Sequence, residues 1–299
     1  GSREAFGLYY DRETNGFLNQ KISLSHEVAL ETPSYMSYYG LGNNSLYVID
    51  DKRFHWVRLS HHQWTTKLNW YSPLRRRKLS LGPVAEAFKV HPFEGRIADE
   101  VGSGFVPENY DYSYYLGGEA GFNYRQLNHE NDPTAGIKLS SSFSYKNNIQ
   151  TSNALSQFKV SFTNYQTFGR TYSWVLATRL GYERTDGQAE IFQMNRLGGN
   201  SYLRGWRNDR FIGDQMAYGN VEGRFPLFKS PNLYLPFTAS LAVGGDIGRV
   251  WLDRENDSAW HQSWSAGISL RFLDLIRLSS YMSFSKENTL FGLSTGWFF

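Results

Sequence analysis

The residues best suited to chemistry gather in one irregular segment, LGGNSYLRGWRNDRFIG, at Leu197–Gly213. This segment is rich in glycine and arginine and lacks the alternation of a strand, and a loop of such length is usually functional. Its centre, Leu203-Arg204-Gly205-Trp206, holds one arginine among a glycine and two bulky side chains. Arginine carries a planar fork of donors that pairs with carboxylates and stacks on aromatic rings. The residue types therefore indicate a binding contact.

A carboxylate that could receive this arginine follows about 40 residues later. Asp246 falls in the same strand phase as Ser240, so we expect it on the polar, inward face of a strand. Gly244 and Gly248 flank it on that face and leave space for a bulky partner. The pattern predicts that Arg204 lies against this wall.

A second pair of charges lies on the strand that follows the loop. Glu222 and Arg224 share one face, opposite Val221, and are also expected to point inward. We predict that Arg204 reaches Asp246 or Glu222, where a hydrogen-bonded pair contributes about 1–3 kcal/mol. One alternative is a solvated loop arginine, whose pairing would contribute much less. Glu222 and Arg224 could also belong to a cross-strand ladder of charges, alone or together with a role in loop docking.

Other chemistry finds no support in the sequence. Of the seven histidines only His61 and His62 are adjacent, and neighbours on a strand point to opposite faces, so a metal site is not expected. The G-x-S-x-G match GLSTG at 292–296 falls within an expected strand and is not a strained strand-to-helix turn, and no glycine-rich phosphate loop precedes a helix. We expect no catalytic residue, no metal and no cofactor.

The dominant pattern of the chain is alternation with period two. Within 260–272, Trp264 and Ile268 share one face, and Ser263 and Ser265 share the other. Strands of about 10–15 residues suit a tilted bilayer crossing better than a β-sandwich, and many apolar faces begin or end in aromatic residues. We predict an all-β fold, a single antiparallel transmembrane β-barrel. Its twelve strands are expected near 17–31, 52–71, 77–90, 112–126, 134–146, 155–168, 171–184, 215–228, 233–252, 259–272, 275–285 and 290–299.

The strands divide the chain into a barrel and a short extension. Residues 17–299 form the predicted barrel, and the link 185–214 is expected to plug its lumen. Residues 1–16 are an N-terminal extension or an extra strand, and fourteen strands is the alternative count. Twelve strands would place both ends of the barrel in the periplasm, because short turns belong there and long loops outside. Gly1-Ser2 is typical of a cloning remnant, so we expect the natural start to lie upstream.

Composition narrows the class of partner. The 299 residues carry a net charge of +3, too small to indicate nucleic acid. Aromatic residues make up 17% of the chain, cysteine is absent, and no apolar run approaches the roughly 18 residues of a membrane helix.

The order of these motifs resembles the BamA-like superfamily of outer-membrane barrels, which includes barrel-assembly insertases, two-partner secretion transporters and sorting barrels. The resemblance is carried over residues 190–299 by a loop tip, an inner-wall glycine-x-aspartate-x-glycine motif and a charged pair. It implies a loop folded back into the lumen. The matching positions are Leu203, Arg204, Gly205 and Trp206 for the tip, Gly244, Asp246 and Gly248 for the wall, and Glu222 and Arg224 for the pair.

Two further features bear on this resemblance. The segment 38–43, YYGLGN, is similar to barrels that follow an N-terminal enzyme domain, such as metallophosphatase fusions. Trp297 and Phe299 resemble the C-terminal assembly signal, although Ser294 stands where that signal has a glycine. Trp206 replaces the usual phenylalanine or tyrosine of the loop tip.

The resemblance implies protein translocation or membrane assembly, without enzyme activity. One alternative is an outer-membrane anchor or exporter for an enzyme domain upstream, and a small diffusion pore is a further alternative. The implied partners are outer-membrane lipids and lipopolysaccharide, the barrel-assembly machinery, and a polypeptide substrate or N-terminal passenger. Nucleic acid is not an expected partner.

Overall fold

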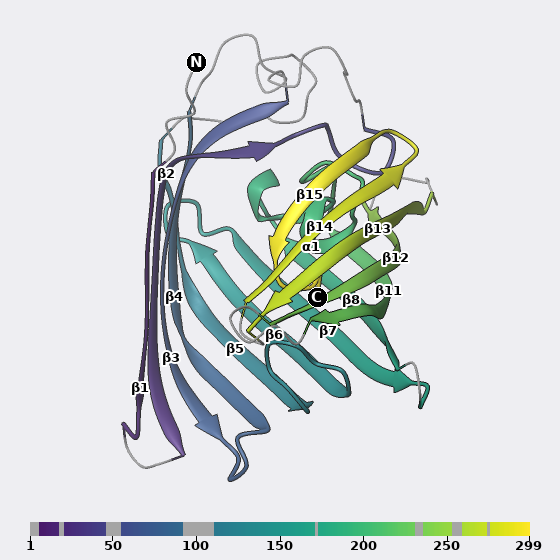
Figure 1. The fold of residues 1–299 in the computed structure, drawn as a ribbon. Coiled ribbons are helices and arrows are strands. Elements are labelled where there is room, and N and C mark those ends of the chain that lie inside the picture. Colours follow the sequence, from purple (N-terminus) through teal and green to yellow (C-terminus); the bar gives the residue numbers. More distant parts are fainter. Residues whose placement is uncertain are drawn as a thin grey trace.

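The chain forms one large antiparallel sheet that curls into a barrel (Figure 1). The computed structural model describes residues 6–17, 21–45, 55–91, 111–170, 173–230, 236–252, 259–273 and 276–299. Within these ranges the main sheet has thirteen strands, ordered β1 to β8 and then β11 to β15, so β1 and β15 are its edges. The strands are β1 Gly7–Asn15, β2 Ile22–Ser37, β3 Trp56–Tyr71, β4 Arg77–His91, β5 Ser113–Leu127, β6 Gly136–Asn148, β7 Ala154–Phe168, β8 Trp174–Gly187, β11 Gln215–Ser230, β12 Phe237–Trp251, β13 His261–Phe272, β14 Ile276–Ser285 and β15 Thr289–Thr295.

The all-β antiparallel fold predicted from alternation is confirmed, and each of the twelve expected strands has a counterpart. The additional strand is β1, which pairs with β2 from Gly7 to Asn15 within the segment expected to be an extension or an extra strand. Every residue of β1 is exposed. The odd count places the start of β1 and the end of β15 at opposite rims, whereas twelve strands would place both barrel ends at one rim.

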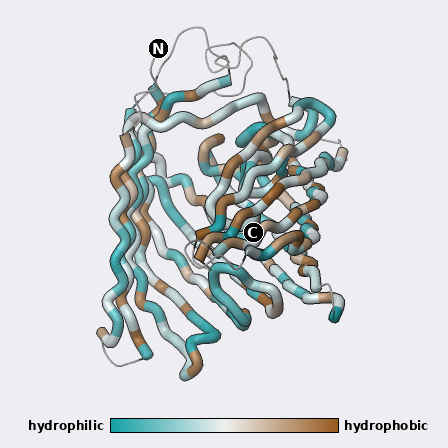
Figure 2. Tube along the Cα trace, viewed as in Figure 1, coloured by the Kyte–Doolittle hydropathy of each residue, from teal (hydrophilic) through white to brown (hydrophobic). Residues whose placement is uncertain are grey.

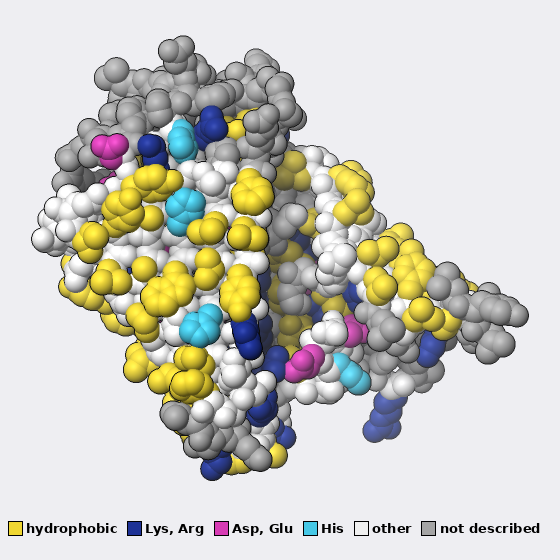
Figure 3. Space-filling model, turned by 90° about the vertical axis from the view of Figure 1, so that its left-hand side faces the viewer, with side chains coloured by type: hydrophobic (Ala, Val, Ile, Leu, Met, Phe, Trp, Pro, Cys, Tyr) yellow, Lys and Arg dark blue, Asp and Glu magenta, His cyan; other side chains and the backbone are white. Residues whose placement is uncertain are grey.

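The two faces of the sheet differ in chemistry. Figure 2 shows hydrophobic and hydrophilic residues mixed along the strands, and Figure 3 shows hydrophobic side chains spread across one outward side of the molecule. On β13, Trp264 and Ile268 are exposed by 68% and 52%, whereas Ser265 and Ser269 face inward and are buried. An apolar outer face with a polar inner face is the pattern of a barrel in hydrocarbon. Within the described ranges no helix has the length and apolar character to cross a membrane.

The link between β8 and β11 contributes residues to two hydrophobic clusters inside the barrel. In one, Leu203 and Trp206 of the link pack with Met216 of β11 and Val250 of β12. In another, Ile212 packs on the inner surface of β2 to β4. The link therefore joins the two sides of the barrel from within and supplies much of its core.

The outward face can be tested by placing a charged side chain on the lipid-facing side of β13. Ile268→Arg near the middle of the strand should lower the free energy of unfolding from phospholipid vesicles by about 2–4 kcal/mol, because the guanidinium would enter hydrocarbon. Gln262→Arg, near the end of the same strand, should cost about 0–1 kcal/mol. Equal losses in urea titrations of the two variants would contradict the assigned membrane depth.

Candidate functional site

The loop between β8 and β11 has a definite local structure, where the sequence suggested irregular chain only. A short helical turn, η2 Ile191–Gln193, leads into β9 Asn195–Leu197, and β9 pairs with β10 Phe211–Gly213. A four-residue helix, α1 Gly199–Tyr202, stands just before the tip. The strands were not apparent in the sequence because three-residue strands are too short to show alternation.

The tip of the loop, Leu203–Trp206, is buried against the inner wall. Arg204 is 3% exposed, and its Nε and Nη2 donate to Oδ2 and Oδ1 of Asp246, each at 2.8 Å. Its backbone N–H donates to Asp246 Oδ2 at 3.0 Å, and its Nη1 donates to Glu222 Oε2 at 2.8 Å. The guanidinium thus contacts both carboxylates that the sequence offered as alternatives.

Neighbouring residues of β11 extend this network. Glu222 accepts a second bond from Nε of Arg224 at 2.9 Å, so the two residues lie beside each other on the same inner face. Asn220 donates to Asp246 Oδ1 at 3.0 Å and to the backbone oxygen of Tyr202 at 2.8 Å. Two arginines and two carboxylates balance in charge, which is the condition under which buried ions are tolerated.

The wall glycines provide the space in which the tip lies. A Cβ at Gly244 would stand 2.4 Å from Arg204 Nη2, and a Cβ at Gly248 would stand 3.0 Å from Leu197 Cδ2. Both positions face inward on β12. A Cβ at Gly244 would force the Arg204 guanidinium to move, and a Cβ at Gly248 would require the Leu197 side chain to shift slightly. These glycines are required for close approach and not for their backbone angles.

The remaining tip residues reach two further strands. Gly205 adopts a φ of +81°, and a Cβ there would lie 3.1 Å from the Phe284 backbone of β14. Its oxygen accepts from Ser285 Oγ at 2.7 Å. Trp206 donates from Nε1 to the Gln262 oxygen of β13 at 3.1 Å. The tip therefore contacts four consecutive strands, β11 to β14.

A second arginine anchors the outer part of the loop, and sequence reasoning missed it. Arg210 is 3% exposed and pairs with both carboxylate oxygens of Glu287 at 2.8 and 2.7 Å. Its Nη1 and Nη2 also donate to Oγ and the backbone oxygen of Ser45. The only available signal was a second arginine in the same loop, which by itself names no partner.

The segment with the weaker resemblance, residues 38–43, also lies on the loop. The Gly42 N–H donates to the Ile212 oxygen at 2.8 Å, and Asn43 exchanges two hydrogen bonds with the Val250 backbone of β12. Burial raises the pKa of Tyr38 in this segment to about 12. The segment connects the end of β2 to the loop and to β12.

The predicted C-terminal signal lies differently from expectation. We expected a strand through residue 299 with Trp297 and Phe299 in its outward phase, but β15 ends at Thr295. Trp297 Nε1 instead donates to Asp132 Oδ1 at 2.7 Å, and the Phe299 oxygen accepts from Arg224 Nη2 at 2.7 Å. The reason is a reversal at Gly296, whose φ of +119° turns the chain away from the sheet.

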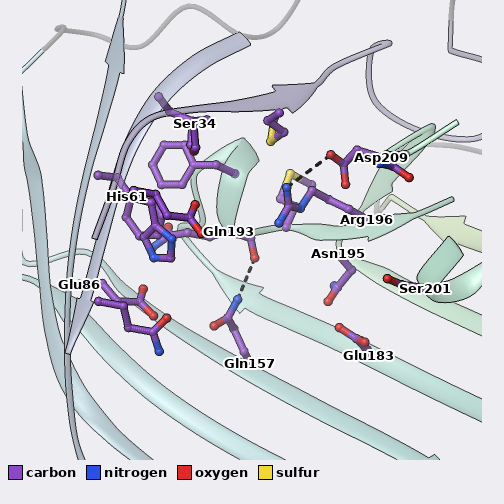
Figure 4. A pocket seen from close by; sticks show the side chains of 18 of the residues that line it. Ser34, His61, Glu86, Gln157, Glu183, Gln193, Asn195, Arg196, Ser201 and Asp209 are labelled. Carbon is purple, nitrogen blue, oxygen red and sulfur yellow. Dashed lines mark hydrogen bonds and ion pairs between the residues drawn. The ribbon is translucent and has the colours of Figure 1, made fainter. Parts of the chain in front are cut away.

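A cavity of about 680 Å³ lies beside the loop and is lined by residues of the loop and of the inner wall from β2 to β8 (Figure 4). Glu86, His61 and Glu183 line its wall, and Gln193 and Arg196 line it from the loop. Three ion pairs lie on its lining: Lys146 with Glu86 at 2.6 Å, Lys159 with Glu183 at 3.0 Å, and Arg196 with Asp209 at 3.6 Å. In the part of the chain that the structure describes, no group of three histidine or acidic side chains could hold a metal.

The fit between tip and wall can be tested at one glycine. Gly244→Ala should expel the Arg204 guanidinium and lower the unfolding free energy by about 3–5 kcal/mol, the range for breaking a buried ion pair. Gly118→Ala is the matched control, because its Cβ would meet only the Gly82 oxygen at 3.8 Å. If Gly244→Ala were as stable as Gly118→Ala in thermal gel-shift and urea assays, the close approach would be refuted.

Comparison with known proteins places this geometry in a family. The Omp85 superfamily domain matches residues 108–274. The fold is similar to that of BamA from Haemophilus ducreyi lacking POTRA domains 1–3, with a TM-score of 0.68, 18% identity, 98% of this chain covered and 62% of that chain. It is also similar to CdiB from Escherichia coli, with a TM-score of 0.56, 14% identity, 97% of this chain covered and 50% of that chain.

This chain therefore spans about 62% and 50% of these two proteins. No curated protein sequence matches it. Because the domain match covers more than half of the 299 residues, the chain belongs to the Omp85 superfamily and is an integral β-barrel of the outer membrane.

Proposed function

We propose that this barrel translocates polypeptides or assembles them into the outer membrane, with the loop tip Leu203–Trp206 acting as an internal brace. Membership of the Omp85 superfamily supports protein translocation or assembly at the level of the family. The role of a brace is supported by the contacts of the tip with four consecutive strands. Arg204 contacts β11 and β12, Trp206 contacts β13, and Gly205 contacts β14.

A brace of this kind divides the wall into a fixed part and a deformable part. The strands β11 to β14 are held in register from the inside by buried hydrogen bonds to one loop. The edge strand β1 has β2 as its partner in the described sheet, and its side chains are exposed. Unpaired strand edges are ready templates for a further strand. The wall can then yield near β1 and β15 while the braced strands keep their register.

The alternative role is an anchor or exporter of an N-terminal enzyme domain. The segment 38–43 supports it through its resemblance to barrels in enzyme fusions. The encoded sequence upstream of Arg3 discriminates the two roles, since periplasmic receptor domains favour translocation or assembly and an enzyme domain favours anchoring.

A diffusion pore has less support because the loop and its hydrophobic clusters occupy the lumen. Large, steady single-channel currents from the unaltered chain would favour this role. Under the proposed function, outer-membrane lipids and lipopolysaccharide contact the outer face, and the barrel-assembly machinery inserts the chain.

The proposed function predicts where a polypeptide substrate contacts the wall. Photo-crosslinking residues at Leu8 of β1 and Leu293 of β15 should yield polypeptide adducts in cells, because both strands are sheet edges. The same group at Ile268 of β13 is the matched control and should contact lipid. Mass spectrometry should identify the adducts at Leu8 and Leu293 as unfolded secreted or outer-membrane polypeptides, and should find none of them at Ile268. Equal adduct yields at all three positions would contradict translocation or assembly at this edge.

A further inference from the structure

Four arginines of the loop and inner wall lie against aromatic rings at the C-terminal end of the described chain. Their edges are already engaged, as in Arg204 with Asp246 and Arg277 with Asp132 Oδ2 at 2.8 Å. Guanidinium planes whose edges are bonded bind best through their faces, and aromatic rings are their preferred partners there. We call this set the arginine cluster: Arg179, Arg204, Arg224 and Arg277.

The last four residues, Gly296–Phe299, which we call the tail, lie on the arginine cluster. Gly296 leaves the sheet with a left-handed φ, and its N–H and oxygen are held by Arg277 O and Ser279 Oγ at 3.1 and 2.7 Å. In Figure 1 the C mark lies over the barrel and not at its rim, in agreement with the contacts of the tail to inward-facing arginines.

Each aromatic ring of the tail meets at least one guanidinium. The Phe298 ring centroid lies 3.9 Å from Cζ of Arg204, the arginine of the loop tip. The Trp297 ring lies 4.0 Å from Cζ of Arg277 and 4.4 Å from Cζ of Arg224. The Phe299 ring lies 4.9 Å from Cζ of Arg179, and two longer contacts join Arg179 to Phe298 and Arg224 to Phe299.

Polar contacts fix the backbone and the indole of the tail. Arg224 donates to the Phe299 oxygen, and Asp132, in the turn between β5 and β6, accepts from the Trp297 indole. Burial alone would raise the pKa of Asp132, but the Trp297 hydrogen bond and the charges of Arg277 and Arg271 hold it below its ordinary value. The carboxylate is therefore ionised at neutral pH and accepts the indole N–H.

We propose that the arginine cluster is a binding site for aromatic side chains of an extended polypeptide, and that the tail occupies this site within the same chain. Stacked guanidiniums recognise the rings, Arg224 recognises a backbone oxygen, and Asp132 recognises an indole N–H. A polypeptide in the lumen competes with the tail for the face of Arg204, so its binding is coupled to the docked loop. This inference rests on the proposed function, because it names the class of polypeptide that the lumen holds.

A labelled peptide tests the site directly. The probe is fluorescein-labelled Gly-Trp-Phe-Phe, and its anisotropy is measured with the full chain and with a chain ended after Thr295, both in nanodiscs. The shortened chain should bind the probe saturably and at least about tenfold more tightly than the full chain, in which the tail occupies the site. Arg277→Gln in the shortened chain should weaken binding about 2- to 30-fold, the range of one ring–cation contact.

Two controls keep the result independent of folding and of transport. A full-length chain with Trp297→Leu, Phe298→Leu and Phe299→Leu keeps its length and should also bind the probe better than the unaltered chain. A Gly-Leu-Leu-Leu probe lacks rings and should not bind. Equal binding to the full and shortened chains, or equal binding of the leucine probe, would overturn the proposal. Probe binding is measured without transport. If the barrel binds the probe but does not translocate or assemble polypeptides, the proposed function is refuted and the binding site is not.

Discussion

The structure depends on one buried guanidinium. Arg204 enters the barrel on a loop and satisfies Asp246 and Glu222, two carboxylates that are 5% and 2% exposed. Without Arg204, the two carboxylates and Arg224 would leave one uncompensated negative charge buried in the lumen. The free-energy cost of that buried charge is much larger than the net stabilisation that the intact ion pair provides. The carboxylates of the wall and the arginine of the loop can therefore be buried only when they are paired with each other.

This constraint explains the small residues around the site. The guanidinium reaches Asp246 because Gly244 has no side chain, and the tip turns beside β14 because Gly205 has a left-handed φ. The clusters around Leu203 and Ile212 then bury the apolar parts of the same loop on opposite sides of the lumen. The ion pairs of Arg204 determine the position of the tip, and the hydrophobic clusters hold the rest of the loop in place. The loop thereby contacts strands that are not neighbours in the sheet, on both sides of the lumen.

Period-two alternation allowed the strands to be predicted, because one face meets hydrocarbon and the other meets the loop. It also placed Asp246 and Glu222 inward, where they contact Arg204. Local patterns could not reveal β9, β10 or the anchor between Arg210 and Glu287, because these depend on partners up to 77 residues away. The tail shows the same limit. The alternating pattern continues to Phe299 and predicts a strand there. Instead, Gly296 has a positive φ that turns the chain, and the aromatic rings after it pack on inward-facing arginines. Strand β1 escaped prediction as a defined element because an exposed edge strand has no buried face to impose a pattern.

The central claim is that the loop tip is buried against the inner wall by Asp246, and the absence of native cysteine makes one measurement decisive. Leu203→Cys, at a fully buried position, is treated with a membrane-impermeant maleimide in a bilayer, beside Asn208→Cys at an exposed position of the same loop. The account predicts that Cys at 203 stays unlabelled while Cys at 208 reacts rapidly, and that adding Asp246→Asn makes position 203 reactive. Equal labelling at both positions with Asp246 intact would contradict it.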